Sequence, residues 1–260
     1  MNTDTVNIIK NWFTGYVSGF YRDDPEYNQP VYLKEQHTKR VCSNIIMIGK
    51  ELGLSPHDLI IAEIIALLHD IGRFRQYELY RTFVDSVSEN HARLGLRQLG
   101  VNKVLSKFPG NDKRLISKAI AHHNALFLPK EDERTLFFIK LIRDADKLDI
   151  WNLFADYYNG KRSNNTMDLD LPDEPVFSKK IIEAISGQIV VNMKDLKTKN
   201  DFKLLQLSWV FDINFIPSFK IIKQNDYITK IANSLPVSEE ISEIVNLASD
   251  YVDTKLGLSL

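Results

Sequence analysis

The chain has 260 residues, more than a typical single domain but within reach of one large helical unit with an extension. Hydrophobic residues make up 44% and charged residues 26%, which supports a sizeable core and excludes disorder over most of the chain. The formal net charge of -1 excludes a chain-wide attraction to nucleic acid polymers or to an anionic membrane, so any anionic ligand needs a local cluster of positive charge.

The start of the chain, residues 1–10, lacks the basic segment and apolar run of a secretory signal. The most apolar run, residues 59–68, is too short for a bilayer and contains Glu63. The single cysteine, Cys42, cannot form an internal disulfide and has apolar neighbours, as expected in a reducing compartment. We therefore expect a cytoplasmic protein without a membrane partner.

Apolar residues recur at helical spacing, and no alternating strand pattern is bounded by hairpin turns, so the sequence predicts an all-α fold. The first predicted helix covers residues 31–52 and ends at Gly53. His37 lies on its apolar face and therefore points toward the core.

The clearest helix start is at Ser55, which can cap the helix, with Pro56 in the first turn. The carboxylate of Asp58 can return to the cap backbone. This apolar helix runs through Leu68 and is expected to stop at Gly72.

A less regular stretch, residues 74–87, leads into a helix that Ser88 is expected to cap and that carries His91. Two further helices are predicted at residues 112–126 and 136–158.

Residues 159–175 are polar and rich in helix breakers, which predicts a long loop that serves as a linker or a lid. Helical patterning returns over residues 177–260, interrupted at Pro217 and Pro236, and 238–251 resembles an amphipathic final helix.

The expected organisation follows from these elements. Residues 1–158 form a helical domain, residues 159–176 a polar loop or lid, and residues 177–260 a helical extension packed on the same unit.

Histidine and aspartate residues recur along the predicted helices in an ordered series, which consists of His37, His69-Asp70, His91, His122-His123 and Asp146. Imidazole and carboxylate are the ligand types that suit zinc, iron, manganese and related ions. The sixth histidine, His57, stands at a helix start and is expected on the surface.

Each member of the series also has an ordinary structural interpretation. His69 near a helix C-terminus is favourable to the helix dipole, although a buried, unpaired Asp70 would be costly. His122 and His123 could face solvent and core respectively, and the acidic residues from Asp144 onward could form a solvated face. Their joint order favours a metal site.

Five segments in this order resemble the HD superfamily of metal-dependent phosphohydrolases: residues 35–41, 67–72, 90–92, 120–123 and 143–149. The resemblance covers roughly residues 30–155. It implies an all-helical HD-domain bundle and hydrolysis of a phosphomonoester or phosphodiester.

The resemblance also implies ligands for a first metal: His37, His69, Asp70 and Asp146. Asp146 is preferred to Asp144 because the family's last aspartate typically precedes a basic and a hydrophobic residue, as Lys147 and Leu148 do here. In family members with two metals, extra histidines hold the second ion, and the HD aspartate bridges the two ions. Here His91 and one or both of His122 and His123 occupy the matching places.

The expected cofactor is one or two divalent transition metal ions, such as iron, manganese, zinc or nickel, with magnesium as an alternative. Such an ion makes a bound water acidic and polarises a phosphoryl oxygen. Asp70 is the expected catalytic carboxylate, and Lys147 and Arg73 are the favoured cations for developing negative charge.

The expected partner is a small phosphorylated, nucleotide-like substrate, and the oligomeric state is open. Two other functions fit the same pattern: an HD-related diiron oxygenase, whose ligands resemble this ordering, and a regulatory ligand-binding module with a vestigial site. The Gly-Tyr-Pro signature of cyclic-di-GMP phosphodiesterases is absent after His123, where Asn124-Ala125-Leu126 stands, and no stringent-response synthetase partner is visible.

Overall fold

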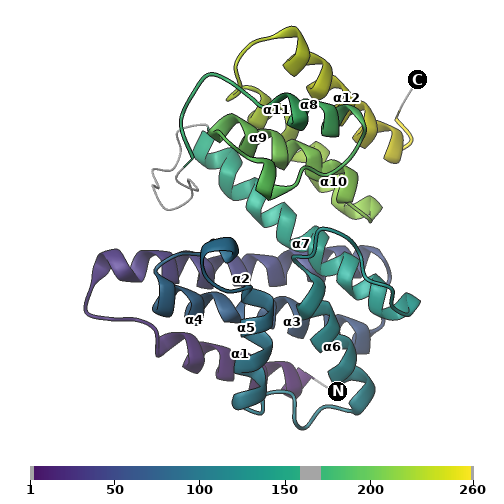
Figure 1. The fold of residues 1–260 in the computed structure, drawn as a ribbon. Coiled ribbons are helices and arrows are strands. Elements are labelled where there is room, and N and C mark those ends of the chain that lie inside the picture. Colours follow the sequence, from purple (N-terminus) through teal and green to yellow (C-terminus); the bar gives the residue numbers. More distant parts are fainter. Residues whose placement is uncertain (1–2, 159–170, 259–260) are drawn as a thin grey trace. The chain divides into compact units, whose positions relative to one another are not determined.

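The computed structural model describes residues 3–158 and 171–258 as helices and connecting loops (Figure 1). It contains no strand within these ranges, so the predicted all-α fold is confirmed. The chain divides into two compact units, Met1–Asp146 and Lys147–Leu260. The predicted domain boundaries stay predictions, and most of the predicted loop lies outside the described residues.

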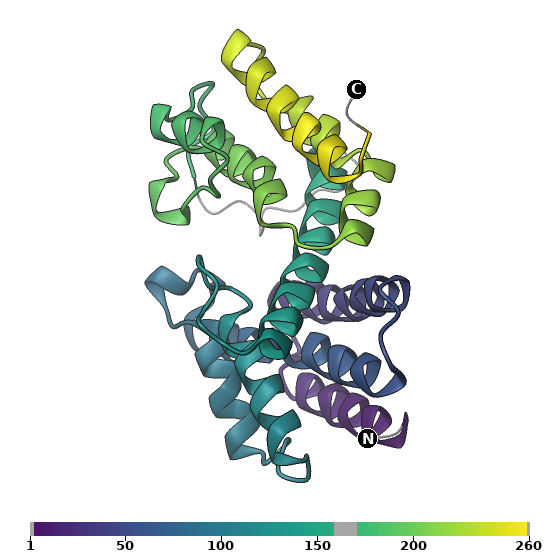
Figure 2. The ribbon, with the colours of Figure 1, turned by 90° about the vertical axis from the view of Figure 1, so that its right-hand side faces the viewer.

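The first unit is a bundle built around one apolar helix, α3. Its helices are α1 (Thr3–Ser18), α2 (Pro25–Glu51), α3 (Pro56–Leu68), α4 (Ile71–Tyr80), η1 (Asp85–Val87), α5 (His91–Val101), α6 (Gly110–His122) and the first part of α7 (Glu133–Tyr158). Helix α3 packs against α1, α2 and α6, and Figure 2 shows α1, α2 and α3 (purple to blue) side by side. Ile61, Ile64 and Leu68 of α3 are fully buried, as expected of a helix that is apolar on most of its surface.

Helix α2 begins at Pro25, so its predicted start at residue 31 was too late. The carboxylate of Asp24 caps it by accepting hydrogen bonds from the backbone N–H groups of Glu26 and Tyr27. Pro30 lies within the helix. The predicted end is confirmed, because Gly53 adopts φ +72°, a left-handed conformation that favours glycine.

Ser55 caps α3 as predicted and accepts a hydrogen bond from the Asp58 N–H. The Asp58 carboxylate accepts from the Ser55 hydroxyl at 2.9 Å, whereas a bond to the cap backbone was predicted. The predicted stop at Gly72 was wrong, because α3 ends at Leu68 and α4 begins at Ile71.

Gly72 instead lies in α4, where this helix packs closely on α5. A Cβ atom at Gly72 would lie 2.1 Å from the His91 carbonyl oxygen and 2.5 Å from the Gly95 nitrogen. Only a residue without a Cβ permits this approach. The glycine read as a helix stop is therefore a packing residue, and the supposedly irregular stretch after residue 74 is helical to Tyr80.

Asn90, not Ser88, caps α5, because the Asn90 side chain accepts a hydrogen bond from the Arg93 N–H. Ser88 instead accepts a hydrogen bond from the buried Gln76 side chain. The helices predicted at 112–126 and 136–158 are present as α6 and α7, each shifted by a few residues.

The second unit contains the end of α7 and the helices that follow it. These are α8 (Lys179–Ser186), η2 (Met193–Asp195), α9 (Lys199–Ser208), η3 (Trp209–Asp212), α10 (Ile216–Gln224), α11 (Tyr227–Ala232) and α12 (Glu239–Lys255). The indole of Trp151 is buried and donates a hydrogen bond to the Gln206 carbonyl. Pro217 lies in the first turn of α10 and Ser238 caps α12, in agreement with the predicted interruptions.

Within the described ranges, every helix is either too short or too polar to cross a membrane.

Candidate metal centre

Six side chains from separate elements of the first unit converge. They are His37 of α2, His69 and Asp70 from the turn between α3 and α4, His91 of α5, His123 at the end of α6, and Asp146 of α7. All are buried except Asp146, whose side chain is 20% exposed. The cluster is therefore largely enclosed by protein, and Asp146 is its most exposed member.

Asp70 lies at the centre of this cluster, with each carboxylate oxygen facing a different pair of histidines. Its Oδ2 is 3.6 Å from His37 Nε2 and 3.9 Å from His69 Nε2. Its Oδ1 is 3.4 Å from His91 Nε2 and 3.8 Å from His123 Nε2. The carboxylate is thus shared between two groups of potential ligands.

Asp146 completes the first of these groups. Its Oδ1 lies 3.1 Å from His37 Nε2 and 3.8 Å from His69 Nε2. Asp144, the alternative considered from sequence, is fully buried and belongs to none of the potential metal-binding groups among the described residues.

The turn at His69 and Asp70 explains how adjacent residues reach one site. Neighbouring side chains on a regular helix point about 100° apart. Asp70 has φ −102° and ψ 13°, outside the α-helical region, whereas His69 remains helical. The chain leaves the helix between them, and both side chains turn toward the same point.

Backbone carbonyls determine which ring nitrogen two of the histidines present. Nδ1 of His69 lies 2.7 Å from the Ala66 carbonyl, and Nδ1 of His123 lies 2.8 Å from the Ile120 carbonyl. A carbonyl oxygen only accepts, so both Nδ1 atoms donate and both rings direct Nε2 into the cluster. His69 Nε2 is buried without a hydrogen-bond partner among the described residues.

Burial lowers the pKa of His69 to about 4, although the charges of Asp70 and Asp146 oppose this effect. The His69 ring is therefore neutral at pH 7. A neutral imidazole is the form that binds a metal ion.

His91 is oriented by a carboxylate that the sequence analysis did not identify. Its Nδ1 lies 2.8 Å from Asp85 Oδ2. Burial alone would raise the pKa of Asp85, but the hydrogen bond from His91 and the charge of Arg73 lower it to about 2, so the ionised carboxylate accepts the Nδ1–H. Burial and Arg73 lower the pKa of His91 itself to about 3, so this ring is also neutral.

The Nε2 atoms of His91 and His123 are 3.0 Å apart. Both rings use Nδ1 as a donor, so both Nε2 atoms are directed toward Asp70 and toward each other. A cation bound by Asp70 and by both nitrogens would use both Nε2 atoms as ligands. A donor set of imidazole nitrogens and carboxylate oxygens on both sides of Asp70 fits divalent transition metal ions.

The remaining two histidines lie outside the cluster. His122 is the last residue of α6, is half-buried, and belongs to none of the described groups that could hold a metal. His57 lies 3.5 Å from Asp112, with its side chain 41% exposed, which agrees with its predicted surface position.

The cations favoured from sequence have acceptors within the protein. Arg73 lies 3.3 Å from Asp70 Oδ1 and also donates to the Gln76 side chain, the Phe83 carbonyl and Asp85. Lys147 belongs to the second unit, where its Nζ is 2.6 Å from Asp212. Their predicted roles in substrate binding stay predictions.

Lys34 was not predicted as a site residue from the sequence, yet its Nζ lies 2.9 Å from Asp70 Oδ2. Burial would raise the pKa of Asp70, but Lys34 and Arg73 lower it well below its usual value. One signal was available, because Lys34 precedes His37 by three residues and therefore shares its helix face. Asp85 had no comparable local signal.

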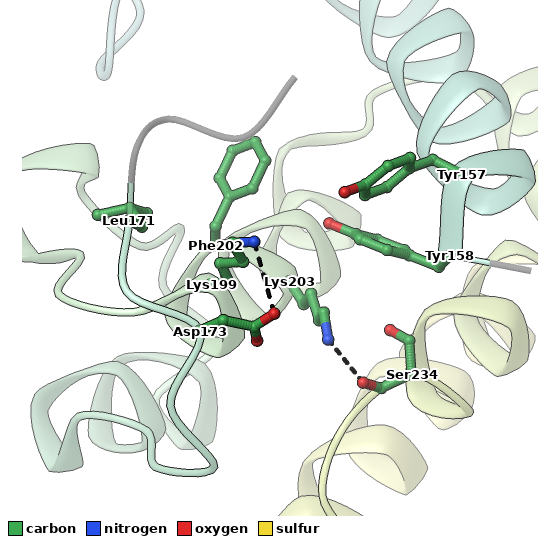
Figure 3. A pocket seen from close by; sticks show the side chains of 8 residues that line it. All are labelled: Tyr157, Tyr158, Leu171, Asp173, Lys199, Phe202, Lys203 and Ser234. Atoms are coloured by element: carbon green, nitrogen blue, oxygen red, sulfur yellow. Dashed lines mark hydrogen bonds and ion pairs between the residues drawn. The ribbon is translucent and has the colours of Figure 1, made fainter. Parts of the chain in front are cut away.

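A separate cavity of about 430 Å³ lies within the second unit (Figure 3). Tyr158, Phe202 and two lysines line it. Lys199 donates a hydrogen bond to the Asp173 carboxylate, and Lys203 donates one to the Ser234 carbonyl. The lining of this cavity contains no histidine. Among the described residues, the groups that could hold a metal ion lie in the first unit.

Comparison with known proteins gives one match. Residues 35–151 match the family model described as the HD domain, a segment that contains all six converging side chains. No curated protein and no solved structure matches the chain.

Proposed function

We propose, from the premise that residues 35–151 form an HD domain, that this protein is a metal-dependent hydrolase of small phosphate esters. The observation that supports this proposal is the position of Asp70. Each of its two carboxylate oxygens faces imidazole nitrogens in a buried cluster. We infer a nucleotide-like phosphomonoester or phosphodiester as the substrate, since the chain offers cations beside this centre.

In this proposal His37, His69, Asp70 and Asp146 would hold one ion. Asp70, His91 and His123 would hold a second. A divalent ion at such a site makes a bound water acidic near neutral pH and polarises a phosphoryl oxygen. Burial keeps the His69 and His91 imidazoles neutral, and Asp85 orients His91.

A specific observation favours a second candidate, an HD-related diiron oxygenase. Both His91 and His123 direct Nε2 toward Asp70. One residue for each position of the ordered series His, His-Asp, His, His, Asp therefore lies in the same cluster. Ligand types alone do not separate hydrolytic from redox use of iron. The two functions differ in their need for dioxygen and for a metal that changes oxidation state.

The deciding experiment measures phosphate release by apoprotein reconstituted with manganese, zinc or iron, across a panel of nucleotides, with and without oxygen. A hydrolase works without oxygen and with redox-silent ions. Release that stops under anaerobic conditions and returns only with iron and air would overturn the hydrolase in favour of the oxygenase. Bound metal without turnover of any substrate would support the regulatory module, and Asp70→Asn serves as the inactive control.

A further inference from the structure

Lys34 lies beside the candidate metal centre, just before the segment that matches the HD domain. Its Nζ is 2.9 Å from Asp70 Oδ2, and 5.5 Å from the centre of the Phe83 ring. The Lys34 side chain is 22% exposed, whereas that of Asp70 is 4% exposed. The ammonium group therefore lies between a buried carboxylate and solvent.

Lys34 differs from the other cations near this centre in what it binds. Arg73 donates to Gln76, the Phe83 carbonyl and Asp85 in addition to Asp70. Arg143 donates to the carbonyls of His123 and Ala125. These acceptors are backbone carbonyls and side chains that supply no candidate metal-binding atom, so both guanidinium groups have acceptors apart from Asp70.

The hydrogen-bond acceptor that the structure describes for Lys34 is Asp70, itself a candidate metal ligand. A cation on Asp70 Oδ2 would draw on the same negative charge and repel the ammonium group. Lys34 then needs another anion within reach. A phosphate group entering from the solvent side would supply one, and lysine binds phosphate as a point charge.

We propose that Lys34 binds the anionic group of the substrate beside the metal centre. The expected effect of Lys34 on catalysis rests on the proposed function. In metal-free protein, Lys34 neutralises Asp70. In the metal-loaded protein, it lowers the dissociation constant of the phosphate-bearing substrate without holding the metal.

The test compares Lys34→Met, which keeps most of the apolar stem but removes the charge, with Lys34→Arg, which keeps the charge. Lys50→Met is the matched control, since Lys50 is exposed in the last turn of the same helix. Metal content, binding of inorganic phosphate to metal-loaded protein by calorimetry, and KM and kcat for p-nitrophenyl phosphate are measured for each variant.

We expect Lys34→Met to retain the wild-type metal content and to raise both the phosphate Kd and KM by about tenfold or more, since one charge-assisted bond is lost. Lys34→Arg should recover part of this loss, and Lys50→Met should stay within about twofold of wild type. Metal should also raise the Tm of Lys34→Met more than it raises the Tm of wild type. The reason is that the metal-free variant lacks one of the two cations that stabilise the buried Asp70 carboxylate.

Unchanged phosphate Kd and KM in Lys34→Met, or loss of metal from this variant, would overturn the inference. If wild type hydrolyses p-nitrophenyl phosphate while Lys34→Met is unaffected, the proposed function stands and the inference fails. If wild type binds phosphate through Lys34 but hydrolyses no ester, the inference stands and the proposed function fails. Wild type that neither binds nor hydrolyses overturns both.

Discussion

Two buried aspartates, one in each unit, show how differently the protein uses the same side chain. Asp201, at the start of α9 in the second unit, is fully buried. Its carboxylate accepts hydrogen bonds from the Ser178 N–H at 2.7 Å, the Ser178 hydroxyl at 2.7 Å and the Lys197 N–H at 2.9 Å. These donors satisfy the buried charge and tie the α9 capping box to the preceding loop.

Asp70 in the first unit accepts hydrogen bonds from the side chains of Lys34 and Arg73, and no backbone N–H of the described residues donates to its carboxylate. Four imidazole Nε2 atoms surround it at 3.4 to 3.9 Å, and two of these rings, His69 and His123, use Nδ1 as donor to a carbonyl. Asp201, whose donors belong to nearby loop and helix-start residues, stabilises the fold. Asp70, which also faces four imidazole nitrogens, is suited to share a cation with them.

The sharpest test of this contrast is to replace each aspartate by asparagine. Asp70→Asn should remove phosphate-ester turnover. It should also weaken metal binding by more than the ~10–100-fold that is typical when a residue hydrogen-bonded to a metal ligand is replaced. Asp201→Asn should keep metal and activity but lower the free energy of unfolding by about 1–3 kcal/mol, because an amide donor would face the backbone N–H groups. Elemental analysis and urea denaturation of both variants measure these effects.

Full metal content in Asp70→Asn, or metal loss in Asp201→Asn with an intact fold, would contradict this division of roles.

A second comparison, between His123 and His122, tests the second metal position. His123→Ala should reduce the wild-type metal content toward one ion per chain, because His123 Nε2 faces Asp70. His122→Ala should leave the metal content unchanged, since His122 lies outside the cluster. Metal-to-protein ratios after reconstitution with manganese or iron give the answer.

If wild type never exceeds one ion per chain, the two-metal interpretation is wrong. Greater metal loss from the His122 variant than from the His123 variant would reverse the assignment of this pair.

Asp85 is expected to act through His91, at a smaller cost than loss of a ligand. Asp85→Asn should weaken binding of the second ion by about 10–100-fold, as is typical when the partner of a metal-binding histidine is changed. Competition with a chromogenic chelator measures this affinity. The double variant with His91→Ala should lose no more affinity than His91→Ala alone, and additive losses would show that Asp85 acts independently of His91.

The last comparison concerns two glycines and affects stability alone. Gly72→Ala should lower the free energy of unfolding by about 1–3 kcal/mol, because the new Cβ would collide with the α5 backbone. Gly15→Ala is the matched control, since no atom lies within 4 Å of a Cβ placed there in α1. It should raise the free energy of unfolding by about 0.5–1 kcal/mol. Equal effects in urea denaturation would show that the close packing of α4 on α5 is unimportant.

Much of the helical framework could be predicted because helix formation and termination are local. Ser55 and Ser238 cap their helices, and Gly53 ends α2 in a left-handed conformation, as the sequence indicated. The ordered His and Asp residues were also recognisable, since they stand at set positions relative to apolar helices. The caps and the helix end depend on residues within a turn or two of one another, and the series of possible ligands depends only on the order of residue types along the chain.

Features that depend on how helices pack were beyond the sequence. The choice of His123 over His122 depends on how the end of α6 faces α5. Asp85 meets His91 through the fold of a short connecting segment, and Lys34 meets Asp70 across 36 residues of chain. Gly72 has the sequence appearance of a helix stop, yet it permits two helix backbones to approach.

The amino-acid sequence by itself therefore determined the all-α class, most of the helices and the candidate ligand types. Only the tertiary structure decided which imidazole nitrogens face Asp70 and which cations lie beside it. The physical reason is that hydrogen bonding and apolar periodicity specify a helix locally, whereas side-chain convergence depends on the angle and distance between helices that are far apart in the chain.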